Sequence, residues 1–205
     1  MKVRRKTSKA ANHPTRERLV DTVVALISTD PDDLRIELIL AESGVSSGSL
    51  YHHFEDVDHL IESAYARRFA MFVDVGVAML TKVAEDAHDR ESMLEGLFEV
   101  TRNTQGAALA PIRYERARIV AMAEHNERFR ETLKAEQQRL TDALTDLIRE
   151  AQERGWMSRD FDPRVGAVMI QAYTLGKVVD DFVDDQMDPD AWVETVNRLI
   201  ERLFA

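Results

Sequence analysis

The stretch that most constrains the fold is AESGVSSGSLYHHF, residues 41–54. It begins like the end of a helix, and Gly44 can adopt the positive φ that reverses a chain after a helix. Val45 is apolar and suits the space between two helices, and Ser46 can cap a second helix over residues 47–53. Two short helices joined by a tight turn with a glycine form a helix-turn-helix, whose second helix enters the major groove of DNA.

The second helix has an apolar side and a polar side. Leu50 and Phe54 are four residues apart and are expected to face inward. The remaining positions carry side chains that hydrogen-bond phosphates or base edges. We therefore predict a DNA-contacting surface at Ser46, Ser47, Gly48, Ser49, Tyr51 and His52.

The segment GVSSGSLYHHFEDVDHL resembles the signature of the TetR family of bacterial transcriptional regulators, roughly G-V-S-x-G-[ST]-L-Y-x-H-F followed by a leucine. The resemblance implies a homodimeric DNA-binding protein with a C-terminal ligand-binding part. The signature covers about a tenth of the chain, and the helical pattern extends the resemblance less specifically. The matching residues are Gly44, Val45, Ser46, Gly48, Ser49, Leu50, Tyr51, His53, Phe54 and Leu60.

Three positions depart from the pattern of the family. Ser47 and Val57 stand where lysines are common, and Arg35 stands where a threonine usually opens the helix-turn-helix. Asp56 and Asp58 flank Val57. Because phosphate contacts supply most of the non-specific affinity for DNA, we expect weak non-specific binding, with the basic N-terminal tail and Arg35 as compensating contacts.

Positive charge is concentrated at the N-terminus. The 205-residue chain has a net charge of −10, which disfavours a general nucleic-acid binder. Residues 1–13 nevertheless hold five Lys or Arg and no acid. We predict either a solubilising leader or an arm that reaches phosphates or the minor groove, with Arg4 and Arg5 as its contacts.

Apolar spacing and helix caps predict an all-α fold of about nine helices. Leu19, Val23, Leu26 and Ile27 form one helical stripe after Pro14, and Asp32 or Asp33 is expected to cap the first helix of the helix-turn-helix. Capping residues, prolines and a glycine then set the later boundaries. The later helices are predicted at 56–87, 89–103, 111–124, 126–154, 163–187 and 189–204.

We divide the chain into an arm (1–13), a DNA-binding domain (14–60, with the helix-turn-helix at about 35–54) and a helical ligand-binding and dimerisation domain (61–205). No transmembrane segment, signal peptide or cysteine is present in the sequence, so a cytoplasmic protein is expected.

The last two helices are predicted to form a homodimer interface. Small residues at Ala172 and Gly176 allow close approach of helices, and a unit that reads palindromic DNA needs two-fold symmetry. Burial of both stripes within one chain is the alternative. In the family this pair of helices forms a four-helix bundle with its twin. The predicted interface residues are Val168, Ala172, Leu175, Gly176, Val179, Trp192, Val196, Leu199 and Ile200.

The resemblance places an effector pocket among the middle helices. Each apolar candidate could instead be ordinary core, and each arginine could lie on the surface. Arg102, Arg113 and Arg116 could hold an anionic ligand. The candidate ligand-binding residues are Met93, Leu97, Phe98, Arg102, Arg113, Tyr114, Met122 and Tyr173.

Other chemistry finds little support in the sequence. His52 and His53 are adjacent and face different ways on a helix, and the acidic stretch 180–190 lacks the pattern of a calcium loop and fits a solvated helix end. No catalytic motif is present, so neither an enzyme nor a cofactor or metal site is expected. We predict a ligand-responsive regulator, most simply a repressor, that binds a palindromic operator. The alternative is a small-molecule or protein-binding module that has lost operator binding.

Overall fold

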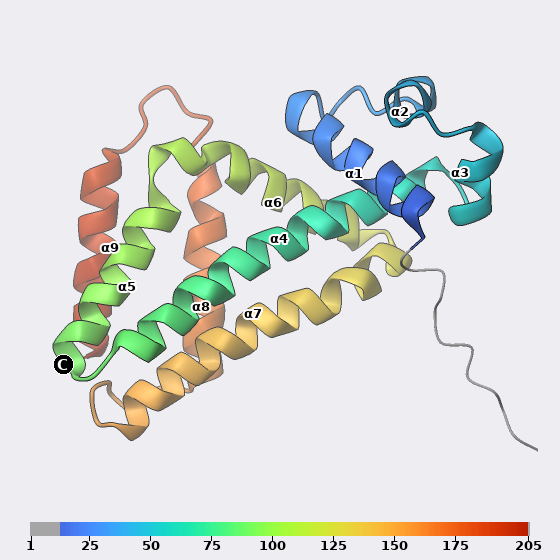
Figure 1. Cartoon of the computed structure of the whole chain (residues 1–205). Coiled ribbons are helices and arrows are strands. Elements are labelled where there is room, and N and C mark those ends of the chain that lie inside the picture. Colours follow the sequence, from blue (N-terminus) through green and yellow to red (C-terminus); the bar gives the residue numbers. More distant parts are fainter. Residues whose placement is uncertain (1–12, 205) are drawn as a thin grey trace, which may run out of the picture. The chain divides into compact units, whose positions relative to one another are not determined.

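The computed structural model describes residues 13–204 of the chain, and this part contains nine α-helices, two 3₁₀ turns and no strand (Figure 1). The predicted all-α fold is confirmed. The chain divides into two compact units, one ending at Arg68 and one starting at Phe69, and the division falls within the long helix α4 (Val57–Asp86). None of the described helices is long and apolar enough to cross a membrane.

The smaller unit consists of α1 (Pro14–Thr29), α2 (Ile36–Ser43), α3 (Ser47–His53) and the first turns of α4. Two arginines join α4 to α1: Arg67 forms ion pairs of 2.5 Å with Glu17 and Asp21, and Arg68 donates to Ser28. Apolar side chains from all four helices fill the space between them. The buried residues include Leu19, Val20, Val23, Ile27, Ile39, Val45, Leu50, Phe54, Leu60, Ala64 and Tyr65.

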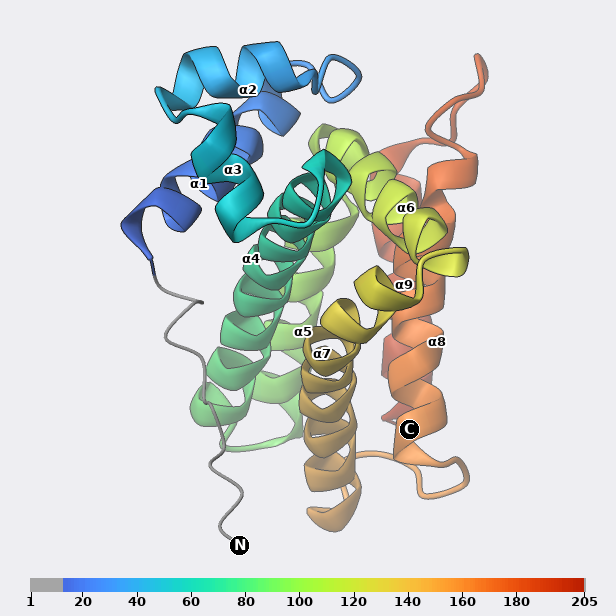
Figure 2. The same cartoon turned by 90° about the vertical axis from the view of Figure 1, so that its right-hand side faces the viewer.

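The larger unit contains the rest of α4 with α5 (Arg90–Gln105), α6 (Ala110–Glu124), α7 (Glu127–Glu153), α8 (Pro163–Gly176) and α9 (Pro189–Leu203). Short 3₁₀ turns lie at Ala107–Leu109 and Lys177–Val179. In Figure 1, α4 and α7 run in similar directions across the upright α8, and Figure 2 shows the same helices from the side. The helix α7 packs on α8, and α5 packs on α9.

Most of the predicted helix boundaries are confirmed because the predicted caps are present. Asp89 and Ser92 form a reciprocal capping box at the start of α5. The side chain of Asn126 caps α7, and Asp162 and Asp188 cap α8 and α9, each followed by a proline.

Two predicted boundaries are wrong. The helix predicted at 163–187 ends at Gly176, and the segment after the 3₁₀ turn is a loop in which the Asp180 carboxylate accepts from the backbone N–H of Met187. The helix α2 begins at Ile36, three residues after Asp33, and no side chain caps it, while Asp33 pairs with Arg35.

Candidate functional sites: a helix-turn-helix face and an apolar cavity

The turn between α2 and α3 has the predicted geometry. Gly44 has φ of 62°, a conformation that L-residues with a side chain rarely adopt, and its N–H donates to the Leu40 carbonyl. Val45 is buried beneath the turn. The Ser46 hydroxyl accepts from the backbone N–H of Ser49 at 3.3 Å, so the start of α3 is capped as expected.

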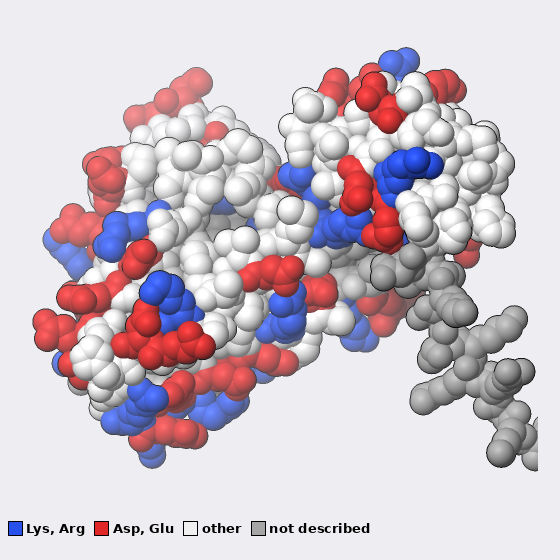
Figure 3. Space-filling view, in the orientation of Figure 1, with Lys and Arg blue, Asp and Glu red and all other residues white. Residues whose placement is uncertain are grey.

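The outward face of α3 is polar and carries no lysine, arginine or acidic residue. Ser47, Gly48 and His52 are exposed, and Tyr51 is 53% exposed, whereas Ser49 is half-buried and bonded to Ser46. Figure 3 shows the surface over α3 as white, with a blue group beside it on the side of α1. This face therefore offers hydroxyl and imidazole groups for hydrogen bonding and no fixed positive charge.

The predicted cationic contacts are only partly available. Arg35 is highly exposed, but its guanidinium is held by both carboxylate oxygens of Asp33, at 2.5 and 2.9 Å. The ion pair lowers the pKa of the Asp33 carboxyl. Arg4 and Arg5 lie outside the described residues. Within 13–204, Arg35 therefore reaches solvent with two of its guanidinium nitrogens bonded to Asp33 and part of its charge offset by that carboxylate.

The acidic turn after α3 has a structural explanation. The Asp56 carboxylate accepts from the backbone N–H of His59 at 2.6 Å, which caps the start of α4.

Two histidines meet at the other edge of the α3 face. The centroids of the His53 and His13 rings are 4.7 Å apart. Desolvation, assisted by His13 and His52, lowers the pKa of His53. At neutral pH the imidazole of His53 is therefore uncharged.

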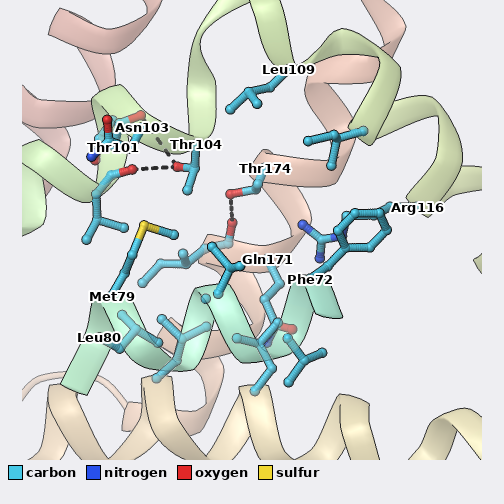
Figure 4. A pocket seen from close by; sticks show the side chains of 18 of the residues that line it. Phe72, Met79, Leu80, Thr101, Asn103, Thr104, Leu109, Arg116, Gln171 and Thr174 are labelled. Carbon is cyan, nitrogen blue, oxygen red and sulfur yellow. Dashed lines mark hydrogen bonds between the residues drawn. The ribbon is translucent and has the colours of Figure 1, made fainter. Parts of the chain in front are cut away.

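The larger unit contains a cavity of about 440 Å³ lined by α4 to α8, the 3₁₀ turn at Ala107–Leu109 and one residue of α9 (Figure 4). Most of its lining is apolar, which suits a small organic molecule. The apolar lining residues are Phe69, Met71, Phe72, Val73, Val75, Met79, Leu80, Leu97, Val100, Leu109, Ile112, Leu140, Leu144, Ile170 and Ile200.

Polar groups gather on a few helices around this cavity. The helix α6 contributes Arg113 and Arg116, and α8 contributes Gln171 and Thr174. Three polar residues come from α5: Thr101, Asn103 and Thr104. Tyr173 also lines the cavity, and burial raises the pKa of its hydroxyl to about 12, so it stays protonated.

Three of the predicted ligand-binding residues line the cavity: Leu97, Arg113 and Tyr173. The other five do not. Met93 is buried in the core cluster with α7, and Arg102 and Tyr114 point outward, since their neighbours in sequence occupy the inward faces of α5 and α6. The remaining two, Phe98 and Met122, are partly buried away from the cavity.

Sequence reasoning missed the contribution of α4 to the cavity. Phe69, Phe72 and Met79 line it, and none of them is among the predicted ligand-binding residues. Gln171 and Thr174 were also missed. A usable signal is their three-residue spacing, which places two polar side chains on one side of an otherwise apolar helix.

An apolar surface is exposed on α8 and the segments around it. Val168 is 52% exposed, and Ala172, Gly176, Val179 and Leu199 are also exposed. We call this surface, together with the exposed Val165, Met169, Phe182, Val183 and Leu203, the α8–α9 face.

The other predicted interface residues lie partly or wholly within the chain. Val196 is 3% exposed, because α9 packs this side against α5, so it is not part of the α8–α9 face. The indole N–H of Trp192 donates to the side-chain oxygen of Gln105 at 3.0 Å. Leu175 and Ile200 are half-buried, like Trp192.

Comparison with known proteins identifies the class. Residues 93–205 match the family model described as the C-terminal domain of BetI-type transcriptional repressors. The chain belongs to the TetR family of transcriptional regulators, and the match covers most of its larger unit.

Three similar proteins illustrate the relationship. The regulator UidR of Escherichia coli K12 is 22% identical over 188 residues, which is 91% of each chain. A putative regulator from Saccharomonospora viridis, solved in complex with choline, has a TM-score of 0.68 at 23% identity and covers 91% of this chain and 95% of its own. A putative TetR-family regulator from Mesorhizobium loti has a TM-score of 0.68 at 14% identity, over 96% of each chain.

Proposed function

We propose that this transcriptional regulator is a ligand-responsive repressor that binds a palindromic operator as a homodimer. The observation that carries the proposal is α3, a capped helix whose outward side holds Ser47, Gly48, Tyr51 and His52 while Leu50 anchors its inward side. Hydroxyl groups can hydrogen-bond either kind of base edge, so this face suits direct readout in a major groove.

The α8–α9 face supports the homodimer. Exposed apolar surface of this extent on neighbouring elements is typical of a protein interface. Ala172 and Gly176 lie one turn apart within it, and a Cβ built at Gly176 meets no atom within 4 Å. A second helix could therefore approach closely at this point. Two copies related by two-fold symmetry would present two recognition helices to two half-sites.

The cavity supports a small-molecule effector. Phe69 and Phe72 line it from α4, and Arg67, on the preceding turn, pairs with α1 of the smaller unit. The helix α4 is thus a continuous element from the cavity lining to the helix-turn-helix unit. A ligand would change DNA binding by having different affinities for the DNA-binding and non-binding states.

A second candidate function is a ligand- or protein-binding module that does not bind an operator. Two features favour it. Arg35 is already paired with Asp33, and the outward face of α3 carries no lysine or arginine, so both features reduce contacts with phosphates. The role of Asp56 favours the repressor instead. Its carboxylate caps the start of α4, so its presence beside α3 has a structural reason and does not indicate a loss of DNA binding.

DNase footprinting of DNA upstream of the protein's own gene separates the two. The repressor should protect two symmetric half-sites whose centres are about 34–36 Å apart, one turn of B-DNA. Absence of any protected palindrome at low salt would leave only the second candidate.

A further inference from the structure

The α6 side of the cavity carries more positive than negative charge. Arg116 lines the cavity and is half-buried, and no other described residue forms a hydrogen bond or an ion pair with it. In Figure 4 its side chain extends from α6 toward Phe72 and Gln171. Burial lowers the pKa of the guanidinium, and no nearby carboxylate opposes the effect, yet an arginine remains charged.

Arg113, one turn earlier on α6, is by contrast fully paired with hydrogen-bond acceptors of the chain. Its guanidinium donates two hydrogen bonds of 2.6 Å to the Asp181 carboxylate and one of 3.1 Å to the Gly106 carbonyl. Lys177 lies 3.6 Å from the same carboxylate. Arg113 and Lys177 thus share one acid, and Arg116 adds a third positive charge with no acid of its own.

The lining itself supplies no counter-charge. None of the described residues that line the cavity is aspartate or glutamate. A charge held in a mainly apolar space without a partner is costly, so sites of this kind are satisfied by water or by a ligand that carries the opposite charge. The planar guanidinium matches a carboxylate in a bidentate geometry.

We propose that the effector is an amphiphilic carboxylate, with its carboxylate on Arg116 and its apolar body among Phe69, Phe72 and Met79. This inference rests on the proposed effector function of the cavity. A quaternary ammonium ion, such as the choline present with the S. viridis neighbour, would meet Arg116 as a like charge in this cavity.

The test compares probes that share one apolar body and differ in the head group. Calorimetric titration of the full chain with 4-phenylbutyrate, 4-phenylbutanol and (4-phenylbutyl)trimethylammonium measures the preference for the head group. The titrations are repeated on Arg116→Gln and on Arg102→Gln, which removes the same charge from an exposed position on α5.

The wild type should bind the carboxylate at least about tenfold more tightly than the alcohol and the ammonium compound. Arg116→Gln should abolish that preference, and Arg102→Gln should preserve it. Arg116→Gln should also melt no lower than the wild type, which shows that a lost preference is not a loss of folding.

Two results would overturn the inference in distinguishable ways. Binding of the alcohol as tightly as the carboxylate, or an unchanged preference in Arg116→Gln, contradicts the anionic ligand but keeps the cavity as an effector site. If no probe of any head group binds, both the carboxylate assignment and the proposed effector function of the cavity fail.

Discussion

At the scale of single residues, the helix-turn-helix is decided by a few side chains whose partners are local. Ser46 caps α3, Asp56 caps α4, and Asp33 holds Arg35. The first two contacts stabilise the unit that we propose to face DNA. The third offsets the charge of the exposed Arg35, so we expect Asp33 to reduce the affinity for DNA.

Replacing Asp33 by asparagine should strengthen DNA binding. Arg35 would lose its carboxylate partner and become available to the backbone of DNA, which should raise affinity and steepen the salt dependence by about one released counterion. Fluorescence anisotropy across a salt series measures both. The exposed ion pair should contribute little to stability, so unfolding should change little.

Glu42→Gln is the matched control, because it removes one exposed negative charge from α2 without releasing an arginine. Equal gains in affinity and slope in the two variants would show that total charge, and not Arg35, sets the effect.

Replacing Gly48 by alanine should separate folding from DNA binding. A Cβ at this position meets no atom within 4 Å in the chain. Alanine should therefore stabilise α3, by at most about 0.5–1 kcal/mol. The added methyl group would project from the face proposed to approach DNA, so affinity should fall. Denaturant unfolding and anisotropy measure the two effects, and a variant with undiminished DNA affinity would remove Gly48 from the interface.

At the scale of secondary-structure elements, the loop after α8 is fixed to α6 by a buried ion cluster. The side chains of Arg113, Lys177 and Asp181 are each no more than 5% exposed. The hydrogen bonds from Arg113 lower the pKa of the Asp181 carboxyl. This carboxylate was predicted to lie in a solvated acidic stretch, and its burial corrects that prediction.

Asp181→Asn should destabilise the larger unit by about 3 kcal/mol, because it leaves two buried cations without a carboxylate. Since the pKa of Asp181 is lower in the folded chain, its contribution is complete above the unfolded pKa of about 3.9 and is lost as pH falls through the folded value. Urea unfolding at neutral and acidic pH measures this, and the variant should show a weaker loss of stability in acid.

Asp185→Asn, at an exposed position in the same loop, should behave like the wild type. A similar loss of stability in both variants would contradict the role assigned to the buried cluster.

The sequence predicted those elements whose signals are local. Gly44, Ser46, Asp89 and Asn126 fix their turns and caps through atoms a few residues away, so pattern reasoning located them. The cavity could not be located in this way. Whether an apolar residue such as Met93 belongs to the core or to a cavity depends on how five helices pack, and spacing within one helix does not contain that information.

Three arginines of the larger unit also show that the sequence does not predict the surroundings of a side chain. Arg102, Arg113 and Arg116 are equivalent candidates in the sequence. In the structure they are respectively exposed, buried in an ion pair, and unpaired at the cavity. The partner that distinguishes Arg113 from Arg116 is Asp181, which is far from both in sequence.

At the scale of the whole molecule, the proposed regulator is a homodimer. The exposed valines of the chain allow a matched test of the interface. Val168 lies on the α8–α9 face and is 52% exposed, whereas Val120 lies on α6 outside that face and is 51% exposed. Val168→Glu should produce monomers in sedimentation velocity, and Val120→Glu should leave dimers intact.

Because Val168 is already exposed in one chain, its replacement should not unfold the protomer. Helical circular dichroism provides that check. A dimer that survives Val168→Glu, or is lost equally in both variants, would contradict the assignment of the α8–α9 face.

The central claim is that α3 reads a specific DNA sequence. The most direct measurement is the equilibrium affinity of the full chain for its own upstream DNA and for a fragment of the same composition in scrambled order, across a range of salt concentrations. The account predicts a preference of about 10³ or more for the upstream sequence, with steeply salt-dependent binding to both. Equal affinity for the two fragments, or no binding to either at low salt, would contradict it.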